Sequence, residues 1–353
     1  MHFVTAKSIL TPRSMNIYRG CSHGCIYCDS RSKCYQFTHD FEDIEVKQNA
    51  PELLEEALRK KRKRCMIGTG SMCDPYIPLE KELGLMRRCL EIIDRYNFGA
   101  TLITKSDLVL RDLDILTRIN NKTKTVVQMT LTTADDELCR KIEPGVCPTS
   151  RRFEVLQACR KADIPTVVWF SPLLPFINDT RENIEGIVDF CARSGVRAII
   201  CFGIGLTLRE GNREYFYAAL DRKFSAQSPR QVVSTSSTTA GTSSVVTTGS
   251  PTAITPTVSS TTEGTSSVVS TSSTTAGSPT VSSTTAGAGT ASLKELYQKT
   301  FGYSYMCSSP HEAELMTHLA KLCRQHNIQL GTDSVFKWIE EFPDTDPLQP
   351  TLF

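Results

Sequence analysis

The sequence predicts an α/β protein in which parallel strands are connected by helices. Short β-branched or apolar runs alternate with amphipathic helical stretches along most of the 353 residues. Six strand-helix units follow one another, and such a series requires parallel strands with right-handed crossovers. One low-complexity segment departs from the pattern, and without it the chain still has enough residues for one large core.

The expected elements follow in chain order. Strands are predicted at residues 14–19, 65–68, 100–104, 125–131, 166–171 and 196–202. Helices are predicted at residues 51–63, 79–96, 108–120, 150–162, 181–194 and 212–224, with two more at 310–327 and 335–341 around a short strand at 328–330. An open doubly wound sheet and a barrel both fit this order, and both place active sites at the C-terminal ends of strands.

The chain is expected to divide into three parts: a core at residues 1–224, an insertion at 225–292 and a C-terminal extension at 293–353 that packs on the core. The insertion is almost entirely Ser, Thr, Ala, Gly, Val and Pro, and residues 232–241 repeat as 268–277. Such a composition offers too few large side chains to offset the entropy of ordering. We therefore expect a disordered insertion with no catalytic part.

Cys21, Cys25 and Cys28 form the most informative motif, Cys-x-x-x-Cys-x-x-Cys. Gly20 and Gly24 permit a tight turn around them. A compact loop of this spacing can wrap three thiolates around a cubane iron-sulfur cluster, which then has one iron without a protein ligand. An iron without a protein ligand can bind a reacting molecule. The motif therefore predicts a reactive metal centre.

A zinc site is the alternative interpretation of the same loop. Cys34 lies six residues beyond Cys28 and would supply the fourth ligand that structural zinc prefers. The protein would then be a non-enzymatic, zinc-bearing nucleic-acid-binding module. Zinc sites more often consist of two separated Cys-x-x-Cys pairs, which this loop lacks.

Composition and cysteine use indicate the compartment. The 14 cysteines are scattered over expected helices and strands, and residues 1–10 lack the apolar segment of a signal peptide. No apolar run approaches the roughly 18 residues of a membrane span. We expect a protein of the cytoplasm, without a membrane partner. The net charge of +2 excludes no class of partner.

Polar motifs follow several of the predicted strands. Gly70, Ser71 and Asp74 follow the second strand, where small residues let backbone groups approach a ligand. Lys105 ends the third strand and can reach a carboxylate or a ribose. Thr130 and Thr132 share one face of the fourth strand, and Ser171 ends the fifth. These residues should meet at one end of the sheet.

The segment from Gly20 to Cys28, with Tyr27 before the third cysteine, resembles the radical S-adenosylmethionine (SAM) superfamily. The resemblance implies a partial (β/α)6 TIM-like barrel, a 4Fe-4S cluster held by the three cysteines, and SAM bound at the free iron. It also implies reductive cleavage of SAM to a 5′-deoxyadenosyl radical, which abstracts hydrogen from an unidentified substrate. An electron donor such as flavodoxin or ferredoxin is the expected partner.

The order of the motifs at the strand ends is similar to the spore photoproduct lyase branch of that superfamily. It includes Glu143-Pro144-Gly145 followed by Pro148 and Arg151-Arg152. The resemblance implies SAM contacts from two groups of residues. They are Gly70, Ser71 and Asp74 at the amino group, and Lys105, Thr130, Thr132, Ser171 and Tyr27 at the carboxylate, ribose, adenosyl and adenine parts.

One departure from that branch concerns the catalytic thiol. The lyase has a hydrogen-donating cysteine where this chain has Ser71, and Cys73 lies two residues further on. Cys73 is therefore the candidate catalytic residue, with a small buried hydrophobe as the alternative. Repair of a DNA photoproduct is the alternative function.

The class of substrate stays open between nucleic acid and peptide. The basic run at residues 59–64 could bind phosphates, but it ends a predicted helix at the end of the sheet opposite the cysteines. A solvated helix end is therefore the favoured interpretation, since cations are stabilised there by the helix dipole.

Overall fold

The computed structural model describes residues 1–224 and 291–343, and these residues belong to one compact unit. Residues 225–290 of the expected insertion and residues 344–353 lie outside the described residues. The prediction of disorder for the insertion is therefore not tested by the structure.

The main sheet of the described unit contains eight strands in the order β13-β10-β9-β8-β7-β6-β3-β2. All neighbours are parallel except β2 and β3. The strands are β2 (Leu10–Thr11), β3 (Ser14–Met15), β6 (Met66–Thr69), β7 (Gly99–Thr104), β8 (Thr125–Thr130), β9 (Thr166–Trp169), β10 (Ala198–Ile200) and β13 (Gln329–Leu330).

The order of the strands decides between the two expected architectures. From β3 to β10 the spatial order follows the chain order, whereas a doubly wound sheet reverses at a switch point. Among the described residues the edge strands β2 and β13 do not pair with each other, so the barrel is open. The predicted partial barrel with six units is confirmed.

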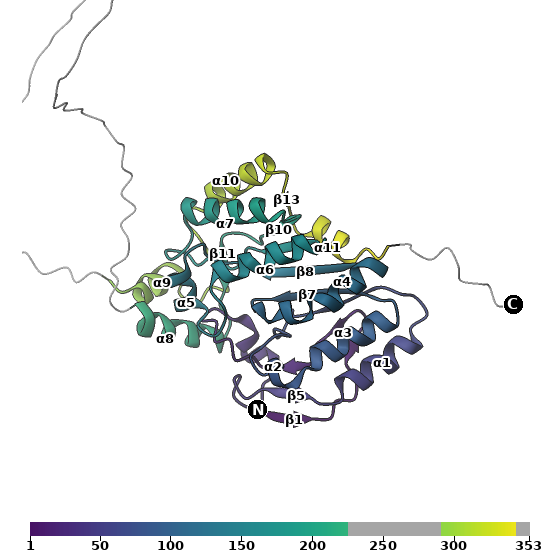
Figure 1. Cartoon of the computed structure of the whole chain (residues 1–353). Coiled ribbons are helices and arrows are strands. Elements are labelled where there is room, and N and C mark those ends of the chain that lie inside the picture. Colours follow the sequence, from purple (N-terminus) through teal and green to yellow (C-terminus); the bar gives the residue numbers. More distant parts are fainter. Residues whose placement is uncertain (225–290, 344–353) are drawn as a thin grey trace, which may run out of the picture. The chain divides into compact units, whose positions relative to one another are not determined.

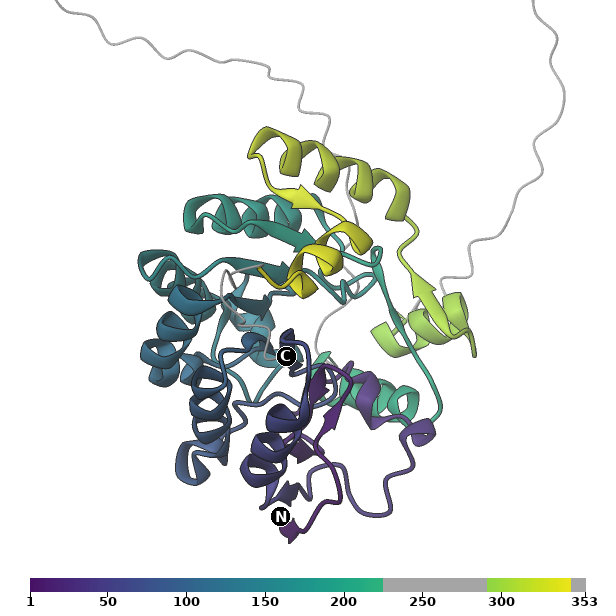
Figure 2. The same cartoon turned by 90° about the vertical axis from the view of Figure 1, so that its right-hand side faces the viewer.

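Helices cover one face of this sheet and follow one another around it (Figures 1 and 2). They are α1 (Ala50–Lys60), α3 (Leu85–Arg95), α4 (Leu113–Lys122), α6 (Thr149–Lys161), α7 (Arg181–Ser194) and α10 (Glu312–Gln325). The others are α2 (Glu80–Leu83), α5 (Asp136–Ile142), α8 (Asn212–Phe224), α9 (Leu293–Phe301) and α11 (Asp333–Glu340), with short 3-10 turns η1 (Asp29–Arg31), η2 (Lys33–Tyr35) and η3 (Asp107–Asp112).

Two predicted elements are interrupted. The helix expected at 79–96 ends at Gly84, whose φ of 60° is left-handed, and restarts as α3. The strand expected at 14–19 divides into β3 and β4 (Tyr18–Arg19). Its second half pairs with β5 (Glu45–Lys47) in a separate sheet of order β1-β5-β4, in which β1 spans His2–Val4. A pairing partner distant in sequence thus redirects the chain.

Alternating side chains on the strands form two hydrophobic layers, as expected for a side-chain period of two. Val127 and Val168 belong to the large core beneath the helices, whereas Val126 and Val167 cluster with Val335 of α11. Helix α11 therefore covers the inner face of the open barrel. The C-terminal extension contributes this helix and the edge strand β13.

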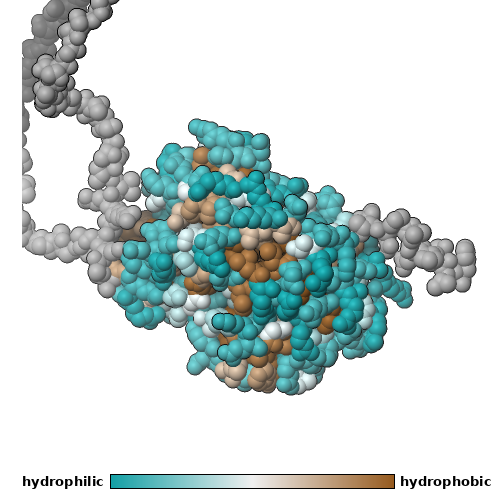
Figure 3. Space-filling model, viewed as in Figure 1, coloured by the Kyte–Doolittle hydropathy of each residue, from teal (hydrophilic) through white to brown (hydrophobic). Residues whose placement is uncertain are grey.

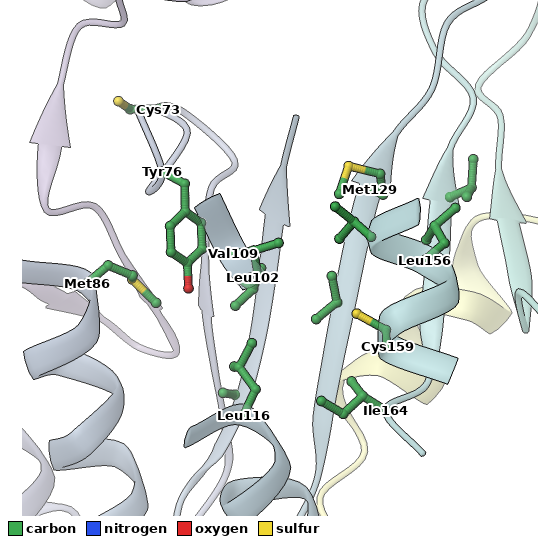
Figure 4. Packing of buried hydrophobic residues seen from close by; sticks show 14 of the residues in the cluster. Cys73, Tyr76, Met86, Leu102, Val109, Leu116, Met129, Leu156, Cys159 and Ile164 are labelled. Carbon is green, nitrogen blue, oxygen red and sulfur yellow. The ribbon is translucent and has the colours of Figure 1, made fainter. Parts of the chain in front are cut away.

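Cysteines fill part of the core beneath the helices. Cys89, Cys159 and Cys191 are fully buried, so they pack as small hydrophobes. Figure 4 shows Cys159 beside Ile164 and Leu156, in the layer between the strands and helices.

The face of the molecule seen in Figure 3 is mostly hydrophilic, with smaller hydrophobic areas. In the described part of the chain, no helix has the length and apolar character to cross a membrane.

Candidate functional site

The loop with the three cysteines lies between β4 and η1 and is largely buried. Cys21 and Cys25 are buried and Cys28 is partly exposed. The Cys21 amide donates to the Phe41 carbonyl at 3.2 Å, which anchors the start of the loop. A Cβ at Gly20 (φ 90°) would lie 2.5 Å from that same carbonyl oxygen. The glycine is therefore required for this close approach.

The Glu143-Pro144-Gly145 turn holds the other end of the cysteine loop. The Gly145 amide donates to the His23 carbonyl at 2.8 Å, and the Ile26 amide donates to the Ile142 carbonyl at 2.9 Å. A Cβ at Gly145 would lie 2.6 Å from the His23 carbonyl oxygen. The turn and the residue before it therefore support the cysteine loop through direct backbone contacts.

A buried ion pair joins this turn to helix α6. Arg152 Nη2 lies 2.6 Å from Glu143 Oε2, and neither side chain has exposed surface. The Tyr27 hydroxyl donates to the Glu143 carboxylate, and Arg152 Nη1 donates to the Thr130 carbonyl at 3.0 Å. Burial raises the pKa of Glu143, but Arg152 and Lys105 more than compensate and hold that pKa below its usual value. The carboxylate stays ionised and orients Tyr27.

Asp74 organises the polar residues behind the cysteine loop. Its carboxylate accepts from the Thr104 hydroxyl at 2.8 Å and from the Lys105 amide at 2.7 Å. His23 Nδ1 lies 3.6 Å from Asp74 Oδ2. Burial lowers the pKa of His23, while Asp74 and Cys21 raise it, with a net increase. The Asp74 carboxylate therefore has hydrogen-bond partners inside the protein, and these bonds hold the end of β7 in place.

A cavity of about 380 Å³ opens beside the cysteine loop. Five of the predicted site residues line it: Tyr27, Cys28, Ser71, Lys105 and Ser171. The remaining wall comes from Asp29, Ser30, Tyr35, Met72, Pro172, Phe202, Gly203, Gly205, Leu206, Thr207, Met306, Ser308 and Glu312. Residues from a metal motif, a glycine turn and two strand ends thus face one space.

Lys105 is the cationic group of this cavity. Its ammonium nitrogen lies 6.0 Å from the centre of the Tyr27 ring. Burial lowers the pKa of Lys105, but Cys25, Glu143 and Asp74 raise it, and the net shift is upward. The lysine is therefore charged at neutral pH and can attract a carboxylate.

Four other predicted SAM contacts are not among the residues that line this cavity. Gly70 has a φ of 99°, and a Cβ there would lie 2.1 Å from the Ile103 carbonyl oxygen. Asp74 has the internal partners described above, and Thr130 and Thr132 are buried at the end of β8. Thr132 Oγ1 has no hydrogen-bond partner within the described part of the chain. Direct SAM contacts by these four residues stay predictions.

Cys73 lies against the cysteine loop and is not among the residues that line the cavity. Its side chain is 5% exposed, and its thiol donates to the Gly20 carbonyl at 2.7 Å. The neighbouring side chains of Cys73 and His23 lower the pKa of Cys21 well below its usual value, against the effect of burial. The catalytic role of Cys73 stays a prediction, and its observed contacts are with the loop.

The zinc alternative requires Cys34 close to the three motif cysteines. Thiolates around a tetrahedral zinc lie about 3.8 Å apart, given Zn–S bonds of about 2.3 Å. Among the described residues, the sulfurs of Cys21, Cys25, Cys28 and Cys34 do not all lie within 4.8 Å of one another. Cys34 is exposed and accepts from Arg209 Nη1 at 3.2 Å. The geometry therefore does not support this alternative.

Sequence reasoning missed one wall of the cavity. This wall includes β11 (Gly205–Thr207), which pairs in antiparallel orientation with β12 (Met306–Ser308), and the exposed side chains of Phe202 and Met306. The two strands are separated by the low-complexity segment, so no local pattern indicates their pairing.

The site fits a cubane cluster with bound SAM. Three cysteines occupy one largely buried loop at the C-terminal edge of a parallel sheet, and the third of them faces a cavity that is also lined by one lysine and four serines. This combination of fold and donor set is typical of an iron-sulfur site with room for a polar cofactor.

The chain belongs to the Radical SAM superfamily, whose profile matches residues 15–191. Enzymes of this superfamily use a 4Fe-4S cluster and SAM. The match spans the cysteine loop and the strands from β3 to β9.

Two curated relatives illustrate the sequence similarity. An uncharacterized protein of Mycobacterium tuberculosis is 29% identical over 220 residues, which cover 59% of this chain and 63% of the relative. An uncharacterized protein of Methanocaldococcus jannaschii is 30% identical over 172 residues, with 48% and 63% covered. The chain thus spans less than two thirds of the length of these relatives.

Solved structures give weaker similarity. Spore photoproduct lyase complexed with dinucleoside spore photoproduct matches with a TM-score of 0.47 and 12% identity, over 64% of this chain and 66% of that chain. SuiB of Streptococcus suis bound to precursor peptide SuiA matches with a TM-score of 0.39 and 15% identity, over 53% and 38%.

Proposed function

We propose that this chain is a radical SAM enzyme in which Cys21, Cys25 and Cys28 hold a 4Fe-4S cluster. When bound, the cluster and SAM supply a reductive cleavage that yields a 5′-deoxyadenosyl radical for hydrogen abstraction. The observation that carries this proposal is the cavity that brings Cys28, Lys105, Ser71 and Ser171 together. The substrate class, nucleic acid or peptide, is open, and so is the identity of the electron donor.

The residues around the cavity have different roles in binding SAM. Lys105 provides a positive charge for the carboxylate of SAM, and the hydroxyls of Ser71 and Ser171 offer hydrogen bonds from the same wall. Tyr27 presents its ring to the cavity while Glu143 holds its hydroxyl. Asp74 stiffens the backbone that carries Lys105. The protein thereby orients the cofactor.

The photoproduct lyase hypothesis requires a hydrogen-donating thiol at the cavity. Ser71 lines the cavity instead, and the Cys73 thiol is engaged with the Gly20 carbonyl. No described contact favours that function, so it is not carried further.

Metal analysis of the cysteine variants tests the proposed site. We expect anaerobically reconstituted parent protein to be brown and to contain about four iron and four sulfide per chain, as a single cubane requires. Replacing Cys21, Cys25 and Cys28 with alanine should abolish both. Cys34→Ala is the matched control, because Cys34 is exposed and lies six residues beyond the motif. Zinc in place of iron, or equal loss of metal in Cys34→Ala, would reject the assignment.

A further inference from the structure

We propose that His2, His39 and Glu45 form a second metal site, which binds a single zinc-class divalent cation apart from the cysteine loop. One ring nitrogen of each histidine and one carboxylate oxygen of Glu45 lie within 4.8 Å of one another. In the parts of the chain that the structure describes, no other group of three His, Cys, Asp or Glu side chains is as close. The proposal does not depend on the radical SAM activity.

The small β1-β5-β4 sheet brings the three residues together. His2 on β1 is the parallel register partner of Glu45 on β5, so their side chains emerge side by side on one face. His39 comes from the loop before β5, and its Nε2 lies 2.8 Å from Glu45 Oε1. The two imidazole rings lie 5.0 Å apart in an edge-on arrangement. Strand pairing thus fixes two ligands, and the loop adds the third.

The outer contacts of both imidazoles are those of metal-binding histidines. His39 Nδ1 lies 2.9 Å from the Asp40 carbonyl oxygen, and His2 Nδ1 lies 3.0 Å from Asp43 Oδ2. With its proton on Nδ1, each ring has a lone pair on Nε2 for a cation. Metal-bound histidines usually donate their second N–H to a carboxylate or a backbone carbonyl in this way. A simple His-carboxylate ion pair does not require both outer acceptors.

The ligand set favours a borderline cation such as Zn²⁺. Imidazole nitrogen and carboxylate oxygen bind zinc at about 2.0–2.2 Å, so the ligand atoms of a tetrahedral site lie about 3.3 Å apart. His39 and Glu45 are 16% exposed and His2 is 41% exposed, so an ion can enter and a water can complete the shell.

Arg19 is the competing charge at this position. Its Nη1 lies 3.1 Å from Glu45 Oε1, while its Nη2 donates to the Tyr35 and Gln36 carbonyls at 3.0 Å. The guanidinium is therefore held in place independently of Glu45. Asp43 places a second carboxylate next to His2, and its other oxygen lies 2.8 Å from the N-terminal ammonium, whose charge it offsets. Because Arg19 directly precedes Gly20, a bound ion would stiffen the chain just before the cysteine loop.

Titration calorimetry with Zn²⁺ tests this site on the full-length protein with its cluster assembled. We expect one Zn²⁺ per chain at this site, and His39→Ala, which removes a direct ligand, should lower the association constant at least about 100-fold, since outer contacts alone contribute about 10- to 100-fold. Asp43→Asn, which changes the outer contact of His2 and an ion pair with the N-terminal ammonium, should lower it about tenfold. His318→Ala is the matched control, because His318 Nε2 also lies 2.8 Å from a carboxylate, that of Glu185, without a third ligand. This control should bind Zn²⁺ like the parent.

Equal Zn²⁺ affinity in the parent and in His39→Ala would overturn the proposal. So would an equal loss in His318→Ala. Co²⁺ added to the chain with Cys21, Cys25 and Cys28 replaced by alanine gives a second measurement. Ligand-field absorption without a thiolate charge-transfer band is expected for a nitrogen and oxygen site. A thiolate band that persists in His39→Ala would instead assign the cation to one of the other cysteines.

Discussion

Arg152 and Glu143 form an ion pair that has no exposed side-chain surface, with 2.6 Å between Nη2 and Oε2. The pair connects the first turn of α6 to the turn after α5, and through the Tyr27 hydroxyl it reaches the cysteine loop. Removing one member of such a pair leaves an uncompensated charge in the interior, which is far more costly than losing an exposed ion pair.

Arg152→Met should therefore destabilise the protein by about 3–5 kcal/mol, because Glu143 is left buried without its cation. Urea unfolding followed by circular dichroism measures the change. Arg181→Ala, which breaks the exposed pair with Glu314, is the control and should cost at most about 1 kcal/mol. Similar losses of unfolding free energy in the two variants would show that the buried pair stabilises the protein no more than the exposed pair does.

The pH dependence of stability should reflect Glu143. Its pKa in the folded state is below the usual value of 4.5, so ionisation of Glu143 stabilises the fold above that pH. This contribution is lost as the pH falls from about 4.5 through the lower folded-state pKa. Glu143→Gln should remove it and flatten the slope of unfolding free energy against pH in that acidic range. Parallel slopes for parent and variant would contradict the assignment.

Gly70→Ala should destabilise the end of β6 more than Gly84→Ala does, although both glycines have positive φ. A left-handed backbone costs a non-glycine residue about 1–2 kcal/mol at either position. At Gly70 the new Cβ would also lie 2.1 Å from the Ile103 carbonyl oxygen, whereas at Gly84 nothing lies within 4 Å. Thermal unfolding should show an additional loss of about 1–3 kcal/mol at Gly70. Equal losses of stability in the two variants would show that the backbone at the end of β6 shifts at little cost to accommodate the new Cβ.

Lys105→Met should weaken SAM binding about 10- to 100-fold without loss of iron. A charged hydrogen bond contributes about 1.5–3 kcal/mol, and Lys105 is the cation of the cavity wall. Equilibrium dialysis with labelled SAM measures the affinity, and iron analysis checks the cluster. Lys33→Met is the control, since Lys33 is exposed and pairs with Glu210. Unchanged affinity in Lys105→Met would remove Lys105 from the proposed SAM site.

Much of the architecture follows from local patterns in the sequence. Ser71, Lys105 and Ser171 could be predicted to share a site because the C-terminal ends of parallel strands meet at one edge. The break at Gly84 was missed because the helical periodicity continues across it, and only the backbone conformation reveals the interruption.

Contacts distant in sequence could not be predicted in the same way. The pairing of β11 with β12 joins segments on opposite sides of the low-complexity stretch. The partnership of Tyr27 with Glu143 depends on how a loop docks on a turn 116 residues away. Neither residue type is unusual at its position, so the sequence carries no local signal for the contact.

The release of methionine and 5′-deoxyadenosine from SAM tests the central proposal most directly. Anaerobically reconstituted parent protein with dithionite should release both products, whereas the variant with Cys21, Cys25 and Cys28 replaced by alanine should release neither. Release that persists in this triple variant, or absence of release from parent protein that contains the full cluster, would contradict the proposed SAM cleavage.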